Sequence, residues 1–211
     1  MSGKKVLITD YVWSSVEPEK KVLAKYGVEL IVAPDGNEDT LVDLAKEVDG
    51  ILTCFAKVTN NVVKSAINCK VIGRFGVGVD NIDVGEATKQ GILVTYVPDY
   101  CIDEVSDHVM GLLLAWNRKI VLHNNDTKLS GWGNAGLGMR IMRLRGKKLG
   151  IVGFGRIGRM VAKKAQAFGL EVLSFDPMIE SDFMNQLEVK KVELDDLLAE
   201  SHFVTLHSPL I

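Results

Sequence analysis

Three glycines in the second half of the chain have the spacing of a phosphate-binding turn. Gly153, Gly155 and Gly158 follow the apolar residues 149–152 and precede a stretch with helical periodicity. Gly153 permits a tight turn, Gly155 lets the backbone approach a pyrophosphate, and Gly158 lets the helix pack closely on the strand. A helix N-terminus also presents free N–H groups and a partial positive charge to phosphates. The pattern therefore predicts a dinucleotide site; the alternative is a glycine-rich turn without a ligand.

An acidic residue follows at the distance expected for a ribose partner. Asp176 comes directly after the next predicted strand, residues 171–175. A carboxylate at this place accepts hydrogen bonds from the adenine ribose 2′-hydroxyl and repels a 2′-phosphate. The sequence therefore predicts NAD in preference to NADP.

A second glycine turn lies upstream, at Gly76-Val77-Gly78, but a third glycine is absent and the dinucleotide pattern fails. Successive backbone N–H groups in such a turn can still bind an anion. Spacing alone leaves a structural turn and a carboxylate-binding loop as equal alternatives.

The histidines and cysteines form no metal-binding or nucleophile pattern, so neither a metal site nor a catalytic residue is predicted. His207, followed by Ser208, ends the last predicted strand, at the edge where ligands bind in open α/β sheets. A cofactor contact and a structural role both stay open for it. Three widely spaced cysteines favour reduced, buried thiols and a cytoplasmic protein: Cys54, Cys69 and Cys101.

Composition and hydropathy exclude several classes of protein. The 211 residues are 47% hydrophobic and 25% charged, with a formal net charge of −2, which gives no reason to expect a nucleic-acid or membrane partner. The apolar residues 6–8 are too few for a signal peptide, and residues 112–116 are too few to span a bilayer.

Short apolar stretches alternate with amphipathic ones along the first hundred residues, which predicts an α/β fold with a parallel sheet. The predicted strands are residues 6–8, 28–32, 50–53, 70–72 and 92–94, and the predicted helices are 16–26, 38–48, 61–67 and 83–90.

Pro98-Asp99 interrupts this rhythm, and we place the domain boundary after residue 100. A long helix is predicted next, with one apolar stripe at Ile102, Val105, Val109, Leu112, Leu113 and Trp116. Residues 124–146 are glycine-punctuated and end in a basic cluster, which favours a solvated or subunit-contacting loop over a phosphate site.

A second sheet is predicted from residue 148. Its strands are residues 148–152, 171–175, 189–192 and 202–207, with helices from about 156 to 168 and over 194–199. This is little more than one of the two mononucleotide halves of a doubly wound domain, so we expect a sequence truncated at its C-terminus.

Taken in order, these motifs resemble those of the D-isomer-specific 2-hydroxyacid dehydrogenase family, which includes phosphoglycerate dehydrogenases and C-terminal-binding corepressors. The resemblance covers essentially all 211 residues and is strongest at residues 73–81, 153–158 with Asp176, and 203–210. It implies a flavodoxin-like substrate domain over 1–100, without its C-terminal return segment. Residues 101–211 would form the N-terminal part of a Rossmann NAD-binding domain.

The family resemblance implies an NAD-dependent oxidoreductase that acts on the CH–OH group of a small D-2-hydroxy acid or its 2-keto acid. It also implies a homodimer, with residues 124–146 at the subunit contact. Val77 and Gly78 would bind the substrate carboxylate. The implied cofactor-binding residues are Val77, Gly153, Gly155, Arg156, Ile157, Gly158, Asp176, His207, Ser208 and Pro209.

The sequence departs from the family pattern in two respects. The family's catalytic Arg, Glu and His would lie beyond Ile211, so we expect the chain alone to bind NAD weakly or not at all and to turn over nothing measurable. Phosphoglycerate dehydrogenases tend to carry an Arg after the third strand, where this chain has residues 53–56. This disfavours a phosphorylated substrate unless Lys57 or Arg74 compensates. An NAD-sensing, non-catalytic regulatory protein is the alternative function.

Overall fold

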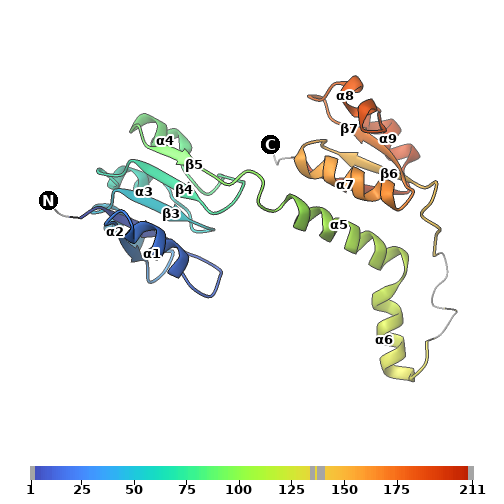
Figure 1. The fold of residues 1–211 in the computed structure, drawn as a ribbon, viewed down its shortest axis with the longest axis horizontal. Helices are drawn as coiled ribbons and strands as arrows, with labels where there is room; N and C mark the ends of the chain where they lie inside the picture. Colours follow the sequence, from blue (N-terminus) through green and yellow to red (C-terminus); the bar gives the residue numbers. More distant parts are fainter. Residues whose placement is uncertain (1–2, 134–135, 137–140, 209–211) are drawn as a thin grey trace. The chain divides into compact units, whose positions relative to one another are not determined.

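The computed structural model describes residues 3–133, 136 and 141–208. The chain divides into two compact units, Met1–Tyr100 (unit 1) and Cys101–Ile211 (unit 2). Each unit contains one parallel β-sheet (Figure 1), so the predicted α/β class with two parallel sheets is confirmed.

Unit 1 is built on a five-stranded sheet with the order β2-β1-β3-β4-β5, in which every pairing is parallel. The order reverses direction at β1, as in doubly wound folds. The strands are β1 (Lys5–Ile8), β2 (Glu29–Val32), β3 (Gly50–Thr53), β4 (Val71–Arg74) and β5 (Leu93–Thr95).

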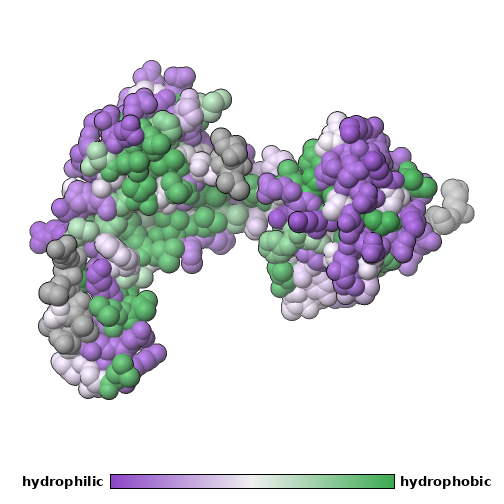
Figure 2. Space-filling view, turned by 180° about the vertical axis from the view of Figure 1, so that it is seen from behind, coloured by the Kyte–Doolittle hydropathy of each residue, from purple (hydrophilic) through white to green (hydrophobic). Residues whose placement is uncertain are grey.

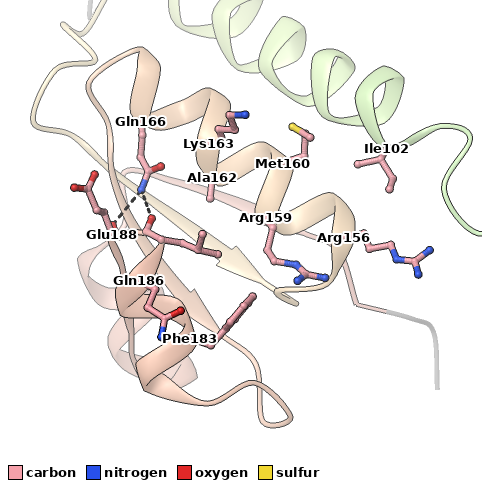
Figure 3. A pocket seen from close by; sticks show the side chains of 11 residues that line it. Ile102, Arg156, Arg159, Met160, Ala162, Lys163, Gln166, Phe183, Gln186 and Glu188 are labelled. Carbon is pink, nitrogen blue, oxygen red and sulfur yellow. Dashed lines mark hydrogen bonds between the residues drawn. The ribbon is translucent and has the colours of Figure 1, made fainter.

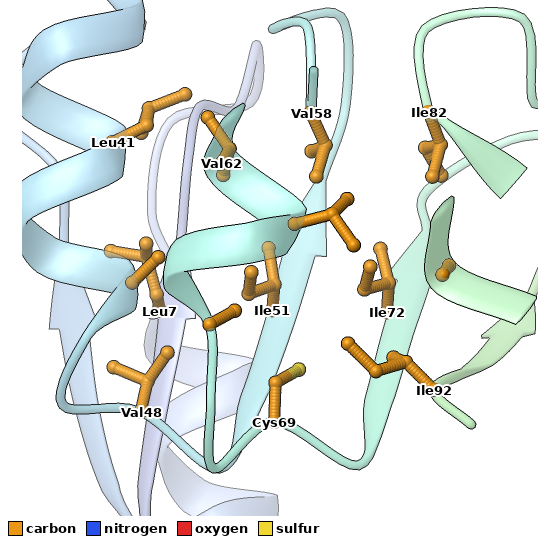
Figure 4. Packing of buried hydrophobic residues seen from close by; sticks show 14 residues of the cluster. Leu7, Leu41, Val48, Ile51, Val58, Val62, Cys69, Ile72, Ile82 and Ile92 are labelled. Carbon is orange, nitrogen blue, oxygen red and sulfur yellow. The ribbon is translucent and has the colours of Figure 1, made fainter. Parts of the chain in front are cut away.

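The core of unit 1 lies between this sheet and three of its four helices (Figure 4). Leu7, Ile51 and Ile72 project from β1, β3 and β4, and all three are buried. They pack against Leu41 and Val62 of the covering helices, whereas α1 contributes no buried residue among those described. The helices are α1 (Glu17–Ala24), α2 (Glu38–Ala45), α3 (Asn60–Ser65) and α4 (Val84–Lys89).

Unit 2 is built on a four-stranded parallel sheet with the order β8-β7-β6-β9. The strands are β6 (Lys148–Val152), β7 (Glu171–Phe175), β8 (Val189–Lys191) and β9 (Phe203–Leu206), and the helices are α5 (Ile102–Asn117), α6 (Ile120–Ser130), α7 (Arg156–Ala167), α8 (Ser181–Gln186) and α9 (Leu194–Glu200).

Helices cover both faces of β6, because successive side chains of a strand point to opposite faces. Leu149 and Ile151 are buried in the cluster that includes α7 and Met110 of α5. Gly150, between them, faces α9: a Cβ added to it would lie 2.4 Å from the Ser201 Oγ. The close approach of α9 to β6 therefore depends on glycine at this position.

The structure corrects the predicted apolar stripe of α5. Leu112 and Trp116 are 59% and 57% exposed, whereas Ser106 and Asn117 are fully buried. The Asn117 amide exchanges two hydrogen bonds with the backbone of Met142, and the Lys164 ammonium donates to the Ser106 hydroxyl. Asn117 is thus satisfied by a partner distant in the sequence, and Ser106 both by Lys164 and by the Ile102 carbonyl one turn earlier in α5.

Lys164 of α7 also binds the first turn of α5 directly. Its ammonium group donates to the Asp107 carboxylate at 2.6 Å and to the Asp103 carboxylate at 3.3 Å. These contacts raise the pKa of Lys164, because the neighbouring carboxylates stabilise its charged form. The network fixes the start of α5 against α7.

Two helices of unit 2 are absent from the sequence prediction. Helix α6 includes residues 124–130 of the predicted loop, and α8 follows β7. None of the α6 residues described is buried, and its charged and apolar residues are not segregated. The periodicity on which helix prediction depends is therefore missing.

Figure 2 shows hydrophobic residues gathered on one face of unit 2. Part of this face is a cavity of about 300 Å³ between α5 and β9, lined by Leu112, Trp116, Phe203 and Val204 among others. Within the described part of the chain β9 pairs with β6 alone, so one of its edges is open.

No helix in residues 3–133, 136 and 141–208 is long and apolar enough to cross a membrane.

Candidate dinucleotide-binding site

The chain turns sharply at the end of β6, and Gly153 adopts a φ of +92°. Its N–H donates to the carbonyl of Phe175, which ends β7. A Cβ added at Gly153 would lie 2.7 Å from the backbone of His207 and Ser208. Both the left-handed conformation and the close backbone exclude any larger residue here.

The other two glycines of the turn have opposite surroundings. A Cβ added at Gly158 would lie 2.3 Å from the carbonyl oxygen of Gly153, so the first turn of α7 packs directly on the glycine turn. At Gly155 no described atom lies within 4 Å of an added Cβ. Gly158 is thus required for packing, whereas Gly155 leaves open space beside the helix start.

Helix α7 begins at this open space. Gly155 is its N-cap residue, and no side chain in the described part of the chain caps the helix. The first N–H groups of a helix have no intrahelical partner, and they carry the positive end of the helix dipole. The α7 N-terminus can therefore bind an anion such as a pyrophosphate.

Asp176 holds the turn as well as lining the site. One carboxylate oxygen accepts a hydrogen bond from the Phe154 N–H at 2.7 Å, and the other accepts from the Met178 N–H at 2.8 Å. Each carboxylate oxygen has two acceptor positions, so both can still accept a ribose hydroxyl. The residue predicted to select the cofactor thus also links β7 to the glycine turn.

A cavity of about 500 Å³ brings five predicted cofactor-binding residues together: Gly153, Gly155, Asp176, His207 and Ser208. The volume is within the usual range for small-molecule sites. Five further lining residues are not predicted from the sequence: Val152, Phe175, Pro177, Met178 and Ile179. For the last three, the apolar character directly after the acidic residue was the available signal.

The remaining predicted cofactor residues lie elsewhere. Ile157 packs against the hydrophobic core, and Arg156 lines a different cavity. Val77 belongs to unit 1, where it is 44% exposed. Pro209 falls outside the described residues.

His207 is part of the cavity wall directly after β9. Its backbone N–H donates to the carbonyl of Val152, and its ring Nε2 lies 3.0 Å from the Thr205 hydroxyl oxygen. Burial lowers the pKa of His207, because the charged imidazolium loses hydration there. The neutral ring can exchange a hydrogen bond with Thr205 while lining the cavity, so a structural role and a ligand contact are compatible.

The upstream turn of unit 1 has a different construction. The Arg74 Nε donates to the Asn81 Oδ1 at 3.1 Å, and the guanidinium lies 5.6 Å from the centre of the Phe55 ring. It also lies against Gly76, where an added Cβ would meet it at 2.1 Å. Arg74, one of the two cations considered for a substrate phosphate, is therefore already held by Asn81 and Phe55.

The loop after β3 is fixed by Asp10, which accepts hydrogen bonds from the N–H groups of Cys54 and Phe55 at 2.9 and 2.7 Å. Burial acts to raise the pKa of Asp10, but these backbone hydrogen bonds outweigh it and hold the pKa below the usual value. Asp10 is ionised at neutral pH and orders the loop at the carboxyl edge of the sheet.

The fold and the site together define a class of protein, the dinucleotide-binding α/β proteins. The family model described as "D-isomer specific 2-hydroxyacid dehydrogenase, NAD binding domain" matches residues 110–211. D-3-phosphoglycerate dehydrogenase of Methanocaldococcus jannaschii is 38% identical over 98% of this chain and 38% of its own length. Hydroxypyruvate reductase of Thermotoga maritima is 40% identical over 82% of this chain and 55% of its own.

Among solved structures, D-lactate dehydrogenase from Aquifex aeolicus, complexed with NAD and lactic acid, superposes with a TM-score of 0.84 at 25% identity. The match covers 99% of this chain and 61% of that one. The chain therefore belongs to the D-isomer specific 2-hydroxyacid dehydrogenase family. It spans between about one third and two thirds of the length of these relatives.

Proposed function

We propose that this chain supplies the cofactor-binding part of an NAD-dependent oxidoreductase acting on a small D-2-hydroxy acid or its 2-keto acid. The observation that carries the proposal is the cavity at the carboxyl edge of the unit 2 sheet. It combines an uncapped helix start, open space at Gly155 and the Asp176 carboxylate. Each of these features suits one part of a dinucleotide.

In this proposal the N–H groups at the start of α7 bind the pyrophosphate, and Asp176 accepts the adenine ribose hydroxyls. Pro177, Met178 and Ile179 form an apolar wall suited to the adenine ring. NAD, when bound, supplies the hydride acceptor for oxidation of the CH–OH group. Arg156 and Ile157 keep the roles implied by the family, next to the pyrophosphate. No residue of this chain is assigned as the acid–base catalyst.

For the acid substrate we propose the turn Val77-Gly78 as the carboxylate-binding loop. Gly78 is exposed, and the loop that faces the same sheet edge is ordered by Asp10. The partial engagement of Arg74 supports a non-phosphorylated acid, although a relative named as a phosphoglycerate dehydrogenase is among the similar proteins. Lys57 remains the alternative cation for a phosphorylated one.

The cofactor proposal is tested by titrating the 211-residue chain with NADH and NADPH, using isothermal calorimetry. We expect NADH to bind more tightly than NADPH by about tenfold or more, because Asp176 repels the 2′-phosphate. Equal affinities for the two cofactors would contradict the assignment.

A pair of glycine variants gives a matched control. Gly155→Val fills the open space at the α7 start and should abolish NADH binding. Gly111→Val, in the exposed part of α5, also meets no described atom at its Cβ position and should leave binding unchanged. Circular dichroism melts of both variants establish that the fold is retained.

We also propose a homodimer, supported by exposed apolar side chains on and after α6. Ile120, Val121, Leu129 and Trp132 are between 54% and 90% exposed. Such a surface is typical of a contact with another chain. Sedimentation of the wild type and of Leu129→Asp tests this: the variant should be monomeric where the wild type is dimeric.

The same exposed surface favours the second candidate function, an NAD-sensing regulatory protein without catalysis. The two functions make different demands on the coding sequence beyond Ile211. A continuation that encodes the family's Arg, Glu and His supports the enzyme, and a stop codon supports the regulatory protein. Three free thiols, two of them buried, support a cytoplasmic location for either.

A further inference from the structure

Unit 2 contains a further cavity, which shares no lining residue with the dinucleotide cavity. It has a volume of about 630 Å³ and lies between α7 and the segment formed by α8 and the residues leading to β8 (Figure 3). Ile102, at the start of α5, borders it. We call it the α7–α8 cavity.

The charge of its lining is unbalanced. Helix α7 contributes three cations, Arg156, Arg159 and Lys163, at spacings that place them along one side of the helix. Glu188 is the one acidic residue among the lining residues described. Within residues 3–133, 136 and 141–208, the Lys163 ammonium group has no hydrogen-bond or ion-pair partner. The cavity therefore favours an anionic occupant.

Arg159 is held in place before any ligand arrives. Its Nε donates to the carbonyl of Gly155 at 3.1 Å, and its guanidinium lies 5.5 Å from the centre of the Phe183 ring. Figure 3 shows its side chain reaching from α7 toward Phe183. A guanidinium fixed in this way loses little conformational entropy when it binds a phosphate or carboxylate.

The rest of the lining is largely apolar, with two glutamines, Gln166 and Gln186. Ile102, Met160, Ala162 and Leu187 provide hydrophobic surface beside the cations. The Gln166 amide donates to the carbonyls of Leu187 and Glu188 at 2.8 and 3.1 Å, the dashed lines in Figure 3. These bonds fix the distance between α7 and the residues after α8, so the cavity is preformed.

We propose that the α7–α8 cavity binds a small organic anion, a phosphate or carboxylate carried on an apolar or aromatic body. Arg159 and Lys163 bind the anionic group, and Phe183 with Met160 contacts the body. The two cavities share no lining residue, and the anionic group contacts Arg159 and Lys163, whereas Arg156 keeps its proposed place beside the pyrophosphate.

The test uses phenyl phosphate and 3-phenylpropionate as probes, with binding measured by ¹⁵N-edited NMR titration of the 211-residue chain. At least one probe should shift the resonances of Lys163 and Phe183 but not those of Asp176. The probe that binds shows whether the site takes a phosphate or a carboxylate. Inorganic phosphate should bind about tenfold more weakly than phenyl phosphate, because it lacks the apolar body.

Three variants decide whether these residues form the site. Arg159→Gln and Lys163→Gln should each lower the affinity for the probe that binds wild type by about tenfold, because each removes one charged contact. Lys190→Gln, an exposed lysine outside the cavity, should not. Equal affinities in Arg159→Gln and Lys190→Gln, no binding of either probe, or shifts centred on Asp176 would overturn the proposal. NADH titration of Lys163→Gln, expected to match wild type, reports on the dinucleotide site separately.

Discussion

The two units each place a glycine turn after a central parallel strand, but the glycines meet different neighbours. In unit 2, Cβ atoms added at Gly153 and Gly158 would lie 2.7 and 2.3 Å from backbone atoms. In unit 1, Cβ atoms added at Gly76 and Gly78 would meet the side chains of Arg74 and Asp80. Side chains can move away, whereas a backbone held by a sheet cannot.

This difference shows why two glycines of the unit 2 turn cannot be replaced without a backbone clash, whereas those of the unit 1 turn can. The unit 2 turn packs helix, strand and the residues after β9 against one another, so Gly153 and Gly158 are required by the fold itself. The unit 1 turn leads into residues that make a single bridge, Val58 to Ile82, before α4 begins. Gly78 leaves the backbone exposed, Gly76 is buried, and neither meets a backbone atom that would exclude a Cβ.

Gly158→Ala should have the largest effect, because the added methyl group meets the Gly153 carbonyl oxygen at 2.3 Å. We expect a loss of about 3 kcal/mol in the free energy of unfolding of unit 2. Urea denaturation followed by hydrogen exchange of peptides from each unit measures it. Gly111→Ala, in an open helical position, should instead stabilise α5 by about 1 kcal/mol. Equal effects of the two variants would refute the packing argument.

Two carboxylates with the same role permit a direct comparison between the units. Each carboxylate accepts hydrogen bonds from two backbone N–H groups, one on each oxygen. Asp176→Asn and Asp10→Asn each replace one of these two oxygens by an NH2 group, which cannot accept. Each should cost its own unit about 1 kcal/mol, because both residues are partly exposed. Only Asp176→Asn should reduce the preference for NADH over NADPH. A change in preference in Asp10→Asn would show that the two sites are not independent.

Gly76→Ala should change the free energy of unfolding of unit 1 by less than about 1 kcal/mol, because the contacting atoms are the flexible end of Arg74. The added methyl group should displace the Arg74 guanidinium and break its hydrogen bond to Asn81. The same denaturation measurement checks this. A destabilisation as large as that of Gly158→Ala would mean that backbone atoms also exclude a Cβ from the unit 1 turn.

The smallest effects concern pH, and they fall in different ranges for the two units. Burial lowers the pKa of His207 from 6.5, so as pH falls below 6.5 the unfolded chain takes up the proton first and unit 2 loses stability. Asp10, whose pKa is lowered from 3.8, stabilises unit 1 at higher pH and loses this contribution only as pH falls below 3.8. Urea midpoints at a series of pH values measure both.

The controls are His207→Gln and Asp10→Asn, each of which should remove the pH dependence from its own unit alone. If His207→Gln leaves the slope of unit 2 between about pH 6.5 and 5 unchanged, another group is responsible for it.

Much of the fold could be predicted because its signals are local. The alternation of strands and helices, the turn at Gly153 and the acidic residue after β7 depend on residues close together in the chain. The prediction was wrong for α5, whose buried face includes Ser106 and Asn117 instead of Trp116. Hydrophobicity alone does not indicate a polar residue that a distant Lys164 or Met142 will satisfy.

Short-range features of the chain were enough to establish the α/β class and to predict the glycine turn and an acidic ribose partner, because each depends on backbone conformation or charge within one segment. The folded chain was needed to show that Gly153 abuts His207 and Ser208, and that Asp176 binds the Phe154 N–H. It also places Arg159 beside Phe183 in a further cavity. These contacts join segments that are far apart in the chain, and packing of the completed sheet brings them together.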